Sequence, residues 1–208
     1  MSRLTKILLC VMLAGLFVGG IGVADAIKVW KNDISDTEKI EVGSLEKGDL
    51  YEGNIAASID MVAEQTTTST YGFMPVSKTT SPYYLIENEN CYMLICVTDV
   101  DKQEEFKELT TQTRGYMYGG YDKLPDGVNV TAQVVEMPDD AKKYLKEYCD
   151  QWGMPETEYA AIVEDAYCLK TVRFSGMKFA PLIGFGLALI CAVILIIRKA
   201  KAPKIVNL

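Results

Sequence analysis

The 208-residue chain contains no histidine, which excludes Ser-His-Asp, Cys-His and HExxH zinc chemistry by this chain alone, because each of them needs an imidazole. All 28 acidic residues lie between residues 25 and 178, together with 15 of the 21 basic ones, so this segment carries a net charge of −13. Such an acidic segment repels nucleic-acid phosphates, and we expect no nucleic-acid partner.

The first hydrophobic segment, residues 7–24, follows a short basic tail of residues 1–6. Its uncharged run from Ile7 to Val23 is just long enough for a transmembrane helix, and longer than the apolar core of most signal peptides. Ala24-Asp25-Ala26 nevertheless has the small-x-small spacing of a signal-peptidase site. Cleavage after Ala26 is left open by the sequence, although we favour an uncleaved anchor.

The second hydrophobic segment, residues 179–197, has no charged residue and precedes a basic tail of residues 198–208. At about 1.5 Å per residue it reaches about 28 Å, close to the thickness of a bilayer's hydrocarbon core, so we predict a transmembrane helix. Small residues recur four apart in both segments, at Gly15, Gly19, Gly184, Ala188 and Ala192. This spacing predicts a hairpin of the two helices or contact with another membrane protein, or it reflects only the abundance of small residues in membrane helices.

The two tails predict the orientation. Both carry only basic charges, and short basic tails stay inside the cell, whereas a long loop is translocated largely regardless of its own charge. We therefore expect a two-pass protein of the cell membrane with both termini in the cytoplasm and the central domain outside.

The central region divides into two parts by its patterning. Residues 25–47 are polar and weakly patterned, which predicts a juxtamembrane segment with at most one helical turn. Residues 48–170 predict one domain, with strands at 51–62, 83–87, 91–98 and 128–134, a Ser/Thr-rich hairpin tip at 64–82, and helices at 99–118, 138–152 and 155–166. Strands followed by helices indicate an α+β fold, with a mainly antiparallel sheet covered on one face by two to three helices.

Two segments show clear periodicity. One strand alternates with polar residues and presents an apolar face formed by Val128, Val130, Ala132 and Val134. The helix after Pro138 carries an apolar stripe at helical spacing, formed by Ala141, Leu145, Tyr148, Cys149 and Trp152. Both patterns predict which side chains enter the core.

Four cysteines lie in the central region. Cys91 and Cys96 stand five apart on one strand, so they point to opposite faces and cannot bridge each other. With Cys149 and Cys168 they allow either one disulfide or four buried thiols. No CxxC spacing exists, so we expect no metal site and no cofactor.

Two further groups of residues have a structural and a functional interpretation. The acids Asp99, Asp101 and Glu104 resemble a calcium-loop fragment, but an EF-hand's glycine and ligand spacing are missing, and we interpret them as helix-capping residues. Six tyrosines indicate either core packing, which we favour, or a ligand-facing patch: Tyr83, Tyr84, Tyr92, Tyr116, Tyr118 and Tyr121. We predict no catalytic, cofactor-binding or metal-binding residue.

Three stretches carry a resemblance: LEKGDLYEGNI, the Thr-rich segment ending in SPYYLIE, and VTAQVVEMPDDAKKYLKEYCDQWG. With the final hydrophobic segment they cover about two-thirds of the chain. In order and patterning, rather than in any chemical motif, they resemble an uncharacterised two-span bacterial family, mainly from Gram-positive anaerobes, described only as a domain of unknown function. The resemblance implies a membrane-anchored outer domain and supplies no catalytic residues.

We expect a membrane protein that displays an extracytoplasmic binding, sensory or assembly-accessory domain. One alternative is a small accessory subunit of a transporter or secretion complex. Another is a carboxylate-based hydrolase that works without histidine. The lack of any nucleophile motif favours binding over catalysis, so we expect no enzyme, with the lipid bilayer and another membrane protein as partners.

Overall fold

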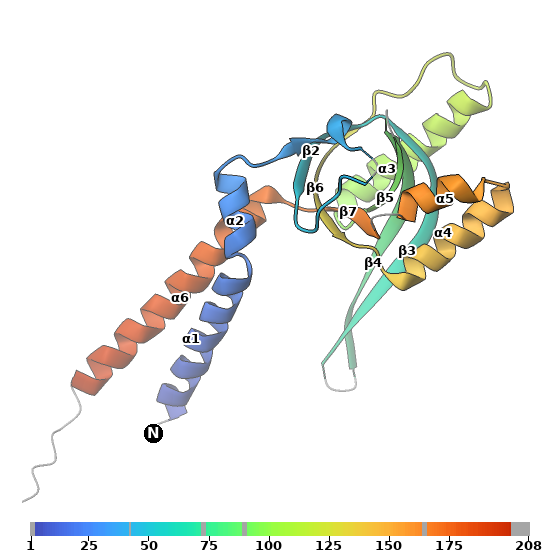
Figure 1. Cartoon of the computed structure of the whole chain (residues 1–208). Coiled ribbons are helices and arrows are strands. Elements are labelled where there is room, and N and C mark those ends of the chain that lie inside the picture. The colour runs from blue at the N-terminus through green and yellow to red at the C-terminus, as the bar shows by residue number, and fades with distance from the viewer. Residues whose placement is uncertain (1–2, 42, 72–73, 89–90, 164–165, 201–208) are drawn as a thin grey trace, which may run out of the picture. The chain divides into compact units, whose positions relative to one another are not determined.

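The computed structural model describes residues 3–41, 43–71, 74–88, 91–163 and 166–200 (Figure 1). They fall into two compact units. One unit combines the chain up to Asp33 with the chain from Phe174 onward, and the other runs from Ile34 to Arg173. The second unit therefore begins at Ile34, whereas the sequence pattern placed the start of the domain at residue 48.

The first unit consists of helices α1 (Arg3–Ile21), α2 (Val23–Trp30) and α6 (Phe174–Ala200). Both α1 and α6 are long and apolar enough to cross a membrane. Helix α2, which follows α1 directly, packs on α6 and buries Ala26 and Val29. Residues 25–30 thus belong to a helix of about two turns, more than the single turn expected of the juxtamembrane segment.

Helices α1 and α6 lie antiparallel and approach closely through small residues. A Cβ added to Gly15 would lie 2.7 Å from the carbonyl oxygen of Gly184, and one added to Gly184 would lie 2.6 Å from the amide nitrogen of Gly19. Ala188 is buried in the same contact between α1 and α6, which we call the seam. Ala192 is only half-buried, and the buried residue near this position is Cys191. The predicted hairpin packing through Gly15, Gly19, Gly184 and Ala188 is confirmed.

The second unit is built on one curved sheet of seven strands in the described part of the chain (Figure 1). Its strands are β1 (Ser35–Asp36), β2 (Leu50–Ile55), β3 (Ala57–Tyr71), β4 (Met74–Asn88), β5 (Cys91–Cys96), β6 (Val128–Glu136) and β7 (Tyr167–Thr171). They lie side by side in the order β1-β2-β6-β7-β5-β4-β3. The curvature is strong, because β2 contacts β4 although three strands lie between them in this order.

The expectation of a mainly antiparallel sheet was wrong, because the sheet is mixed. Strand β1 runs parallel to β2, and β7 runs parallel to β5. The sequence pattern missed β7, which is only five residues long and follows the helices. It inserts between β5 and β6, so a late segment of the chain completes the centre of the sheet.

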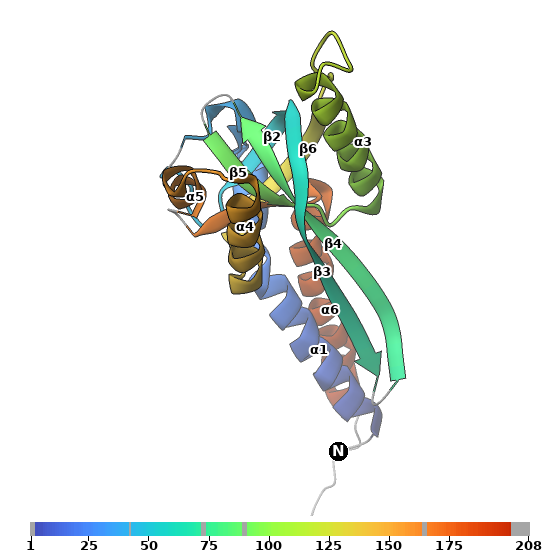
Figure 2. The ribbon, with the colours of Figure 1, turned by 90° about the vertical axis from the view of Figure 1, so that its right-hand side faces the viewer.

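Helices cover both faces of the sheet, not one face as expected. Helix α3 (Val100–Met117) lies on one side, and α4 (Asp139–Trp152) with α5 (Glu156–Val163) lies on the other (Figure 2). Alternate residues of the central strands enter the two cores: Tyr84 and Ile86 pack with Phe106 of α3. On the opposite face, Tyr83, Leu85 and Leu94 pack with Leu145 and Ile162 of α4 and α5.

Most of the periodic patterns are confirmed. The four apolar residues of β6 are all buried, and the strands expected at 83–87 and 91–98 lie in β4 and β5, which pair antiparallel. On α4 the buried residues are Ala141, Leu145 and Cys149. Trp152 is 56% exposed, so its predicted place in the core is wrong: it lies in the last turn of α4, where Gly153 ends the helix.

Strand β3 ends the sheet, and helix α3 covers part of this edge. The amide of Ser58 donates to Thr113 Oγ1 at 3.2 Å, and its hydroxyl lies 2.7 Å from Thr110 Oγ1. Arg114 of α3 forms an ion pair with Asp60. Covering an edge strand in this way satisfies backbone groups that are otherwise free to pair with another chain.

The Ser/Thr-rich hairpin is formed by the far ends of β3 and β4. These two segments pair with each other from Thr66–Thr80 to Ser69–Ser77. Residues 72–73 at the tip lie outside the described residues.

Candidate functional site

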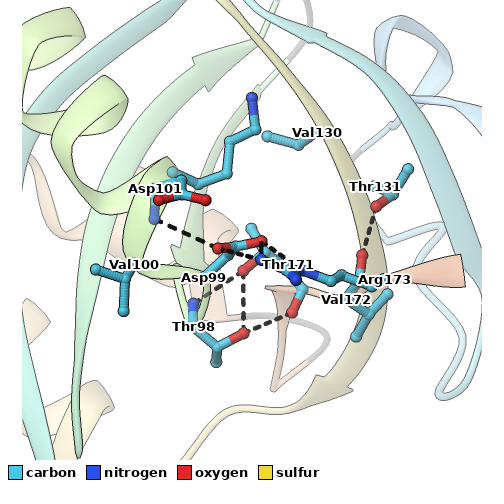
Figure 3. A pocket seen from close by; sticks show the side chains of 10 residues that line it. Thr98, Asp99, Val100, Asp101, Val130, Thr131, Thr171, Val172 and Arg173 are labelled. Carbon is cyan, nitrogen blue, oxygen red and sulfur yellow. Dashed lines mark hydrogen bonds and ion pairs between the residues drawn. The ribbon is translucent and has the colours of Figure 1, made fainter. Parts of the chain in front are cut away.

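The first candidate site is a pocket of about 430 Å³ in the second unit (Figure 3). Three parts of the chain form it: the start of α3, the middle of β6 and the end of β7. Its lining residues are Thr98, Asp99, Val100, Asp101, Lys102, Val130, Thr131, Thr171, Val172 and Arg173. Of these, the sequence patterns singled out Asp99 and Asp101 as capping residues.

Asp99 is the N-cap of α3, and its side chain accepts a hydrogen bond from the amide of Asp101. An N-cap carboxylate satisfies one of the helix's free amides and interacts favourably with the positive end of the helix dipole. The interpretation of these acids as capping residues is confirmed for Asp99, while Asp101 lies in the first turn of α3 and donates its amide to Asp99 (Figure 3).

The same Asp99 carboxylate forms a bidentate pair with Arg173. The guanidinium Nε and Nη2 donate to Oδ2 and Oδ1, each over 2.8 Å. Such fork-shaped pairing is the strongest geometry of a charge-assisted hydrogen bond. It lowers the pKa of Asp99 and raises that of Arg173, because each charge stabilises the other.

Two threonines extend this connection. The amide of Thr98 donates to Thr171 Oγ1 and the Thr98 hydroxyl donates to the Thr171 carbonyl, each over 2.8 Å. The hydroxyl of Thr131 donates to the carbonyl of Val172. We call the four residues Thr98, Asp99, Thr171 and Arg173 the clasp. Arg173 immediately precedes Phe174, the first residue of α6, so the clasp fastens the chain to the domain just before this helix.

The charges of the pocket are largely paired with one another. Asp99 is bound to Arg173, and Lys102 is bound to Glu105 at 2.5 Å. Among the described residues, no group of three or more histidine, cysteine or acidic side chains has an arrangement that could hold a metal ion. Because its ion pairs are internal, we interpret this pocket as a structural attachment.

The second candidate site concerns the tyrosines. Tyr83 and Tyr84 are buried in the two cores, as predicted, and the ring centroid of Tyr84 lies 5.4 Å from that of Phe106. The three later tyrosines instead are exposed. Tyr118 is 75% exposed, and the exposed neighbours that surround it in the chain are Tyr116, Met117, Tyr121 and Leu124. The core-packing interpretation is therefore wrong for this half of the set. We call residues 116–126 the tyrosine loop.

The tyrosine loop is held in place by a capped helix end. Gly119 has a φ of +77°, which favours glycine, and the amide of Gly120 donates back to the carbonyl of Gly115. The ring of Tyr121 lies directly over Gly115, where a Cβ would overlap it. The exposed side chains are thus presented on an ordered turn. The sequence analysis did not single out Met117 or Leu124. For Met117 a signal was available, because it lies between two tyrosines directly before Gly119-Gly120.

Two shallow depressions adjoin the tyrosine loop. One, of about 390 Å³, is lined by Gln112 and residues 121–126, and the other, of about 240 Å³, is lined by residues of α3 and 126–128. Gln112 and Asp126 line both, so the two depressions are neighbours. Their acidic side chains are Glu105, Glu108, Asp122 and Asp126. The basic group of the loop, Lys123, lies 3.9 Å from Asp126.

All six cysteines lie among the described residues, and each is a free thiol. Cys91 and Cys96 face opposite cores, as predicted. Cys96 and Cys168 share one core on adjacent strands, and burial raises the pKa of the Cys168 thiol to about 12. Of the two alternatives that the sequence left open, the structure shows free thiols, of which Cys96, Cys149 and Cys168 are buried and Cys91 is half-buried.

Residues 1–199 match a protein family described as a domain of unknown function (DUF8577). No curated protein matches the chain. The match covers α1, α6 up to its last residue but one and the whole of the second unit, so the family model includes both apolar helices and the sheet.

Proposed function

The chain belongs to the DUF8577 family, a domain of unknown function, and from this premise we propose that it is a two-pass membrane protein whose outer domain binds a partner protein. The tyrosine loop carries the proposal. Five large side chains are exposed there within one short stretch, which consists of the end of α3 and the turn that follows it, and backbone hydrogen bonds hold this turn in place. Exposed apolar clusters of this kind mark interaction surfaces.

The helical unit supports the membrane placement. Helices α1 and α6 are both long and apolar enough to span a bilayer, and their antiparallel packing supports a two-pass arrangement with both ends of the chain on the same side. The purely basic tails favour the cytoplasmic side for these ends.

Binding fits the site better than catalysis. The sequence has no histidine, and the pocket's best-placed carboxylate, Asp99, is engaged in capping and pairing. A carboxylate-based hydrolase needs two carboxyl groups free to act in a cleft. An accessory subunit of a transporter or secretion complex is one version of this binding role. In that version, helices of the partner contact exposed apolar side chains of α1 and α6, such as Phe17 and Ile183.

A labelling experiment tests the orientation. Thr67→Cys lies in the exposed part of the β3–β4 hairpin, and Lys199→Cys lies in the last turn of α6. A membrane-impermeant maleimide should label the first variant in intact cells and both variants after lysis, with the unmodified chain as background. Labelling of only Lys199→Cys in intact cells would reverse the orientation.

Co-purification tests the binding role of the tyrosine loop. The full chain is cross-linked in native membranes and purified, alongside a Tyr118→Ser, Leu124→Ser double variant. Tyr144→Ser on α4, where Tyr144 is also exposed, is the matched control. We expect one partner to be recovered with the unmodified chain and the control, and to be depleted with the double variant. Equal recovery from all three would remove the tyrosine loop as the binding surface.

A further inference from the structure

We propose that the tyrosine loop and the adjoining depressions bind a cationic, amphipathic segment of a partner polypeptide, in which apolar side chains are interspersed with Lys or Arg. This inference rests on the proposed function, because it names the chemical class of partner for the same surface. Three properties of the surface lead to it: its exposed apolar side chains, its fixed backbone and the sign of the surrounding charge.

The apolar side chains suit a protein partner. Tyrosine and methionine are enriched at interfaces, since they offer large contact areas, and tyrosine loses little conformational freedom on binding. Tyr116, Met117 and Tyr118 end helix α3 or follow it directly, and Tyr121 is fixed against Gly115. Because hydrogen bonds already hold the turn in place, binding costs little conformational entropy there.

The charge around the apolar side chains selects a basic partner. Four acids line the depressions, namely Glu105, Glu108, Asp122 and Asp126. Lys102 is paired with Glu105 and Lys123 with Asp126, which leaves Glu108 and Asp122 as the acidic groups without an opposing lysine among these lining residues. The whole segment 25–178 carries a charge of −13. A negative surface of this kind accelerates the approach of cations and disfavours anionic partners.

The same charge disfavours the other occupants of an exposed apolar surface. A second copy of the chain would bring two acidic surfaces together, and like charges in contact oppose association. A membrane surface rich in anionic lipids would likewise be repelled, since lipid binding of protein surfaces depends on Lys and Arg. A basic polypeptide segment gains from both the apolar and the charged part of this surface.

The depressions also indicate the length of the bound segment. Glu105 and Gln112 are seven residues apart on α3, which corresponds to about 10 Å along the helix. An extended segment of about three residues spans this distance. A further few residues reach the side chains of Tyr118 and Leu124, so a peptide of about ten residues is long enough to cover the surface.

Binding of three synthetic peptides to the full chain in phosphatidylcholine nanodiscs tests the inference. The peptides share one pattern of Leu and Trp, and their other positions are all Lys, all Glu or all Ser. Fluorescence anisotropy measures each dissociation constant at about 50 mM and at about 300 mM salt. The Lys peptide should bind at least about tenfold more tightly than the Ser peptide, and the Glu peptide should bind most weakly.

Two sets of variants separate specific binding from general attraction to an acidic protein. Tyr118→Ser with Leu124→Ser should weaken the Lys peptide about tenfold, whereas the control Tyr144→Ser should leave its affinity unchanged. Glu108→Gln with Asp122→Asn should weaken it severalfold and reduce its salt dependence. Asp140→Asn with Glu147→Gln, at exposed positions on α4, is the matched control for charge.

Each other outcome overturns the inference. Equal binding of the three peptides, preference for the Glu peptide, or no binding below about 1 mM would show that the surface does not select cations. If the charge variants and their control lost affinity for the Lys peptide equally, the binding would depend only on the net charge of the protein. Vesicle binding or self-association that depends on Tyr118 would assign the surface to lipid or to a second copy. If native co-purification identifies a partner with no basic segment at the contact, the proposed function stands and this inference fails.

Discussion

Asp99 shows how much one side chain contributes at the residue scale. Its carboxylate caps α3 and pairs in bidentate fashion with Arg173. The local sequence accounts for the first role, because a carboxylate before a helix with acids in its first turn is a common N-cap. The second role joins residues 74 positions apart. It places a charge pair directly before the apolar helix α6.

The clasp has a pH dependence that can be measured. Pairing with Arg173 lowers the pKa of Asp99 below its ordinary value of 3.8, so its contribution to stability is full above this value and is lost as the pH falls through the lowered pKa. Asparagine keeps the cap but not the charge. The melting temperature of Asp99→Asn, measured by circular dichroism, should lie below that of the unmodified chain at pH 7. The difference should shrink as the pH falls below 3.8 and vanish only once the pH lies below the lowered pKa of Asp99. A difference that persists in acid would mean that the charge pair is not its cause.

Cys168 gives a second prediction at this scale. Its side chain is fully buried and its pKa is raised to about 12, so the thiol is both inaccessible and protonated at pH 8. We expect a maleimide to modify Cys168 only in denaturant, with modification sites determined by mass spectrometry. Rapid modification of Cys168 in native buffer would show that β7 opens readily.

At the scale of elements, α4 illustrates how far periodicity determines packing. The stripe from Ala141 through Leu145 to Cys149 is buried, as its spacing predicts, because each of these residues faces the sheet. Trp152 continues the same spacing but lies in the final turn, mostly exposed, with its ring 6.2 Å from that of Tyr148. A periodic stripe predicts a face of the helix, whereas the extent of the surface beneath it decides where burial stops.

Substitutions on α4 test this register. Leu145 is fully buried, and Leu145→Ala should lower the free energy of unfolding by about 2–5 kcal/mol, because it leaves a cavity. Lys143→Ala on the exposed face should change it by less than about 0.5 kcal/mol. Denaturant titration of both variants measures the difference. Equal destabilisation by the two substitutions would mean that the helix faces have been assigned incorrectly.

The seam between α1 and α6 gives a further prediction for an element pair. A side chain at Gly184 would lie 2.6 Å from the backbone of Gly19, whereas one at Gly186 meets nothing within 4 Å. Gly184→Val should therefore force the helices apart and destabilise the detergent-solubilised chain by about 1–3 kcal/mol. Gly186→Val is the control and should behave like the unmodified chain in thermal-aggregation assays. Identical behaviour of both variants would argue against the close approach.

At the scale of the whole molecule, the boundaries of the second unit, Ile34–Arg173, matter for its stability. Ile40 is 1% exposed in the core, and Thr37 is equally buried and receives a hydrogen bond from Asn88 at its carbonyl. Both precede residue 48, and the clasp includes Thr171 and Arg173, which follow residue 170. A fragment of residues 48–170 thus lacks parts of the core and of the clasp.

Two fragments test this boundary. Residues 34–173 should fold as a soluble monomer without the apolar helices, since they contain both cores. The free energy of unfolding of residues 48–170 should be lower by about 2–5 kcal/mol or more. This is the usual cost of losing one large buried aliphatic side chain. Urea titration and size-exclusion chromatography compare the two. Equal unfolding midpoints would place the true boundary at residue 48.

The sequence by itself determined the features that depend on near neighbours in the chain. These are the two apolar helices and their small-residue spacing, the alternation of β6, the buried stripe of α4 and the cap at Asp99. Each arises from a repeat of two or of three to four residues, or from a capping group beside its helix, so the signal is complete within a few residues. The acidic charge of the central region is likewise a property of composition.

Only the tertiary structure decided which segments meet. Strand β7 enters the middle of the sheet and makes it mixed, Arg173 reaches Asp99, and the six tyrosines divide between the cores and an exposed loop. A strand's partners and the side of a helix that remains uncovered depend on residues far away in the chain, whose approach is governed by the packing of the whole domain. The tyrosines of the core and those of the loop have the same chemistry, and only the presence or absence of a covering layer separates them.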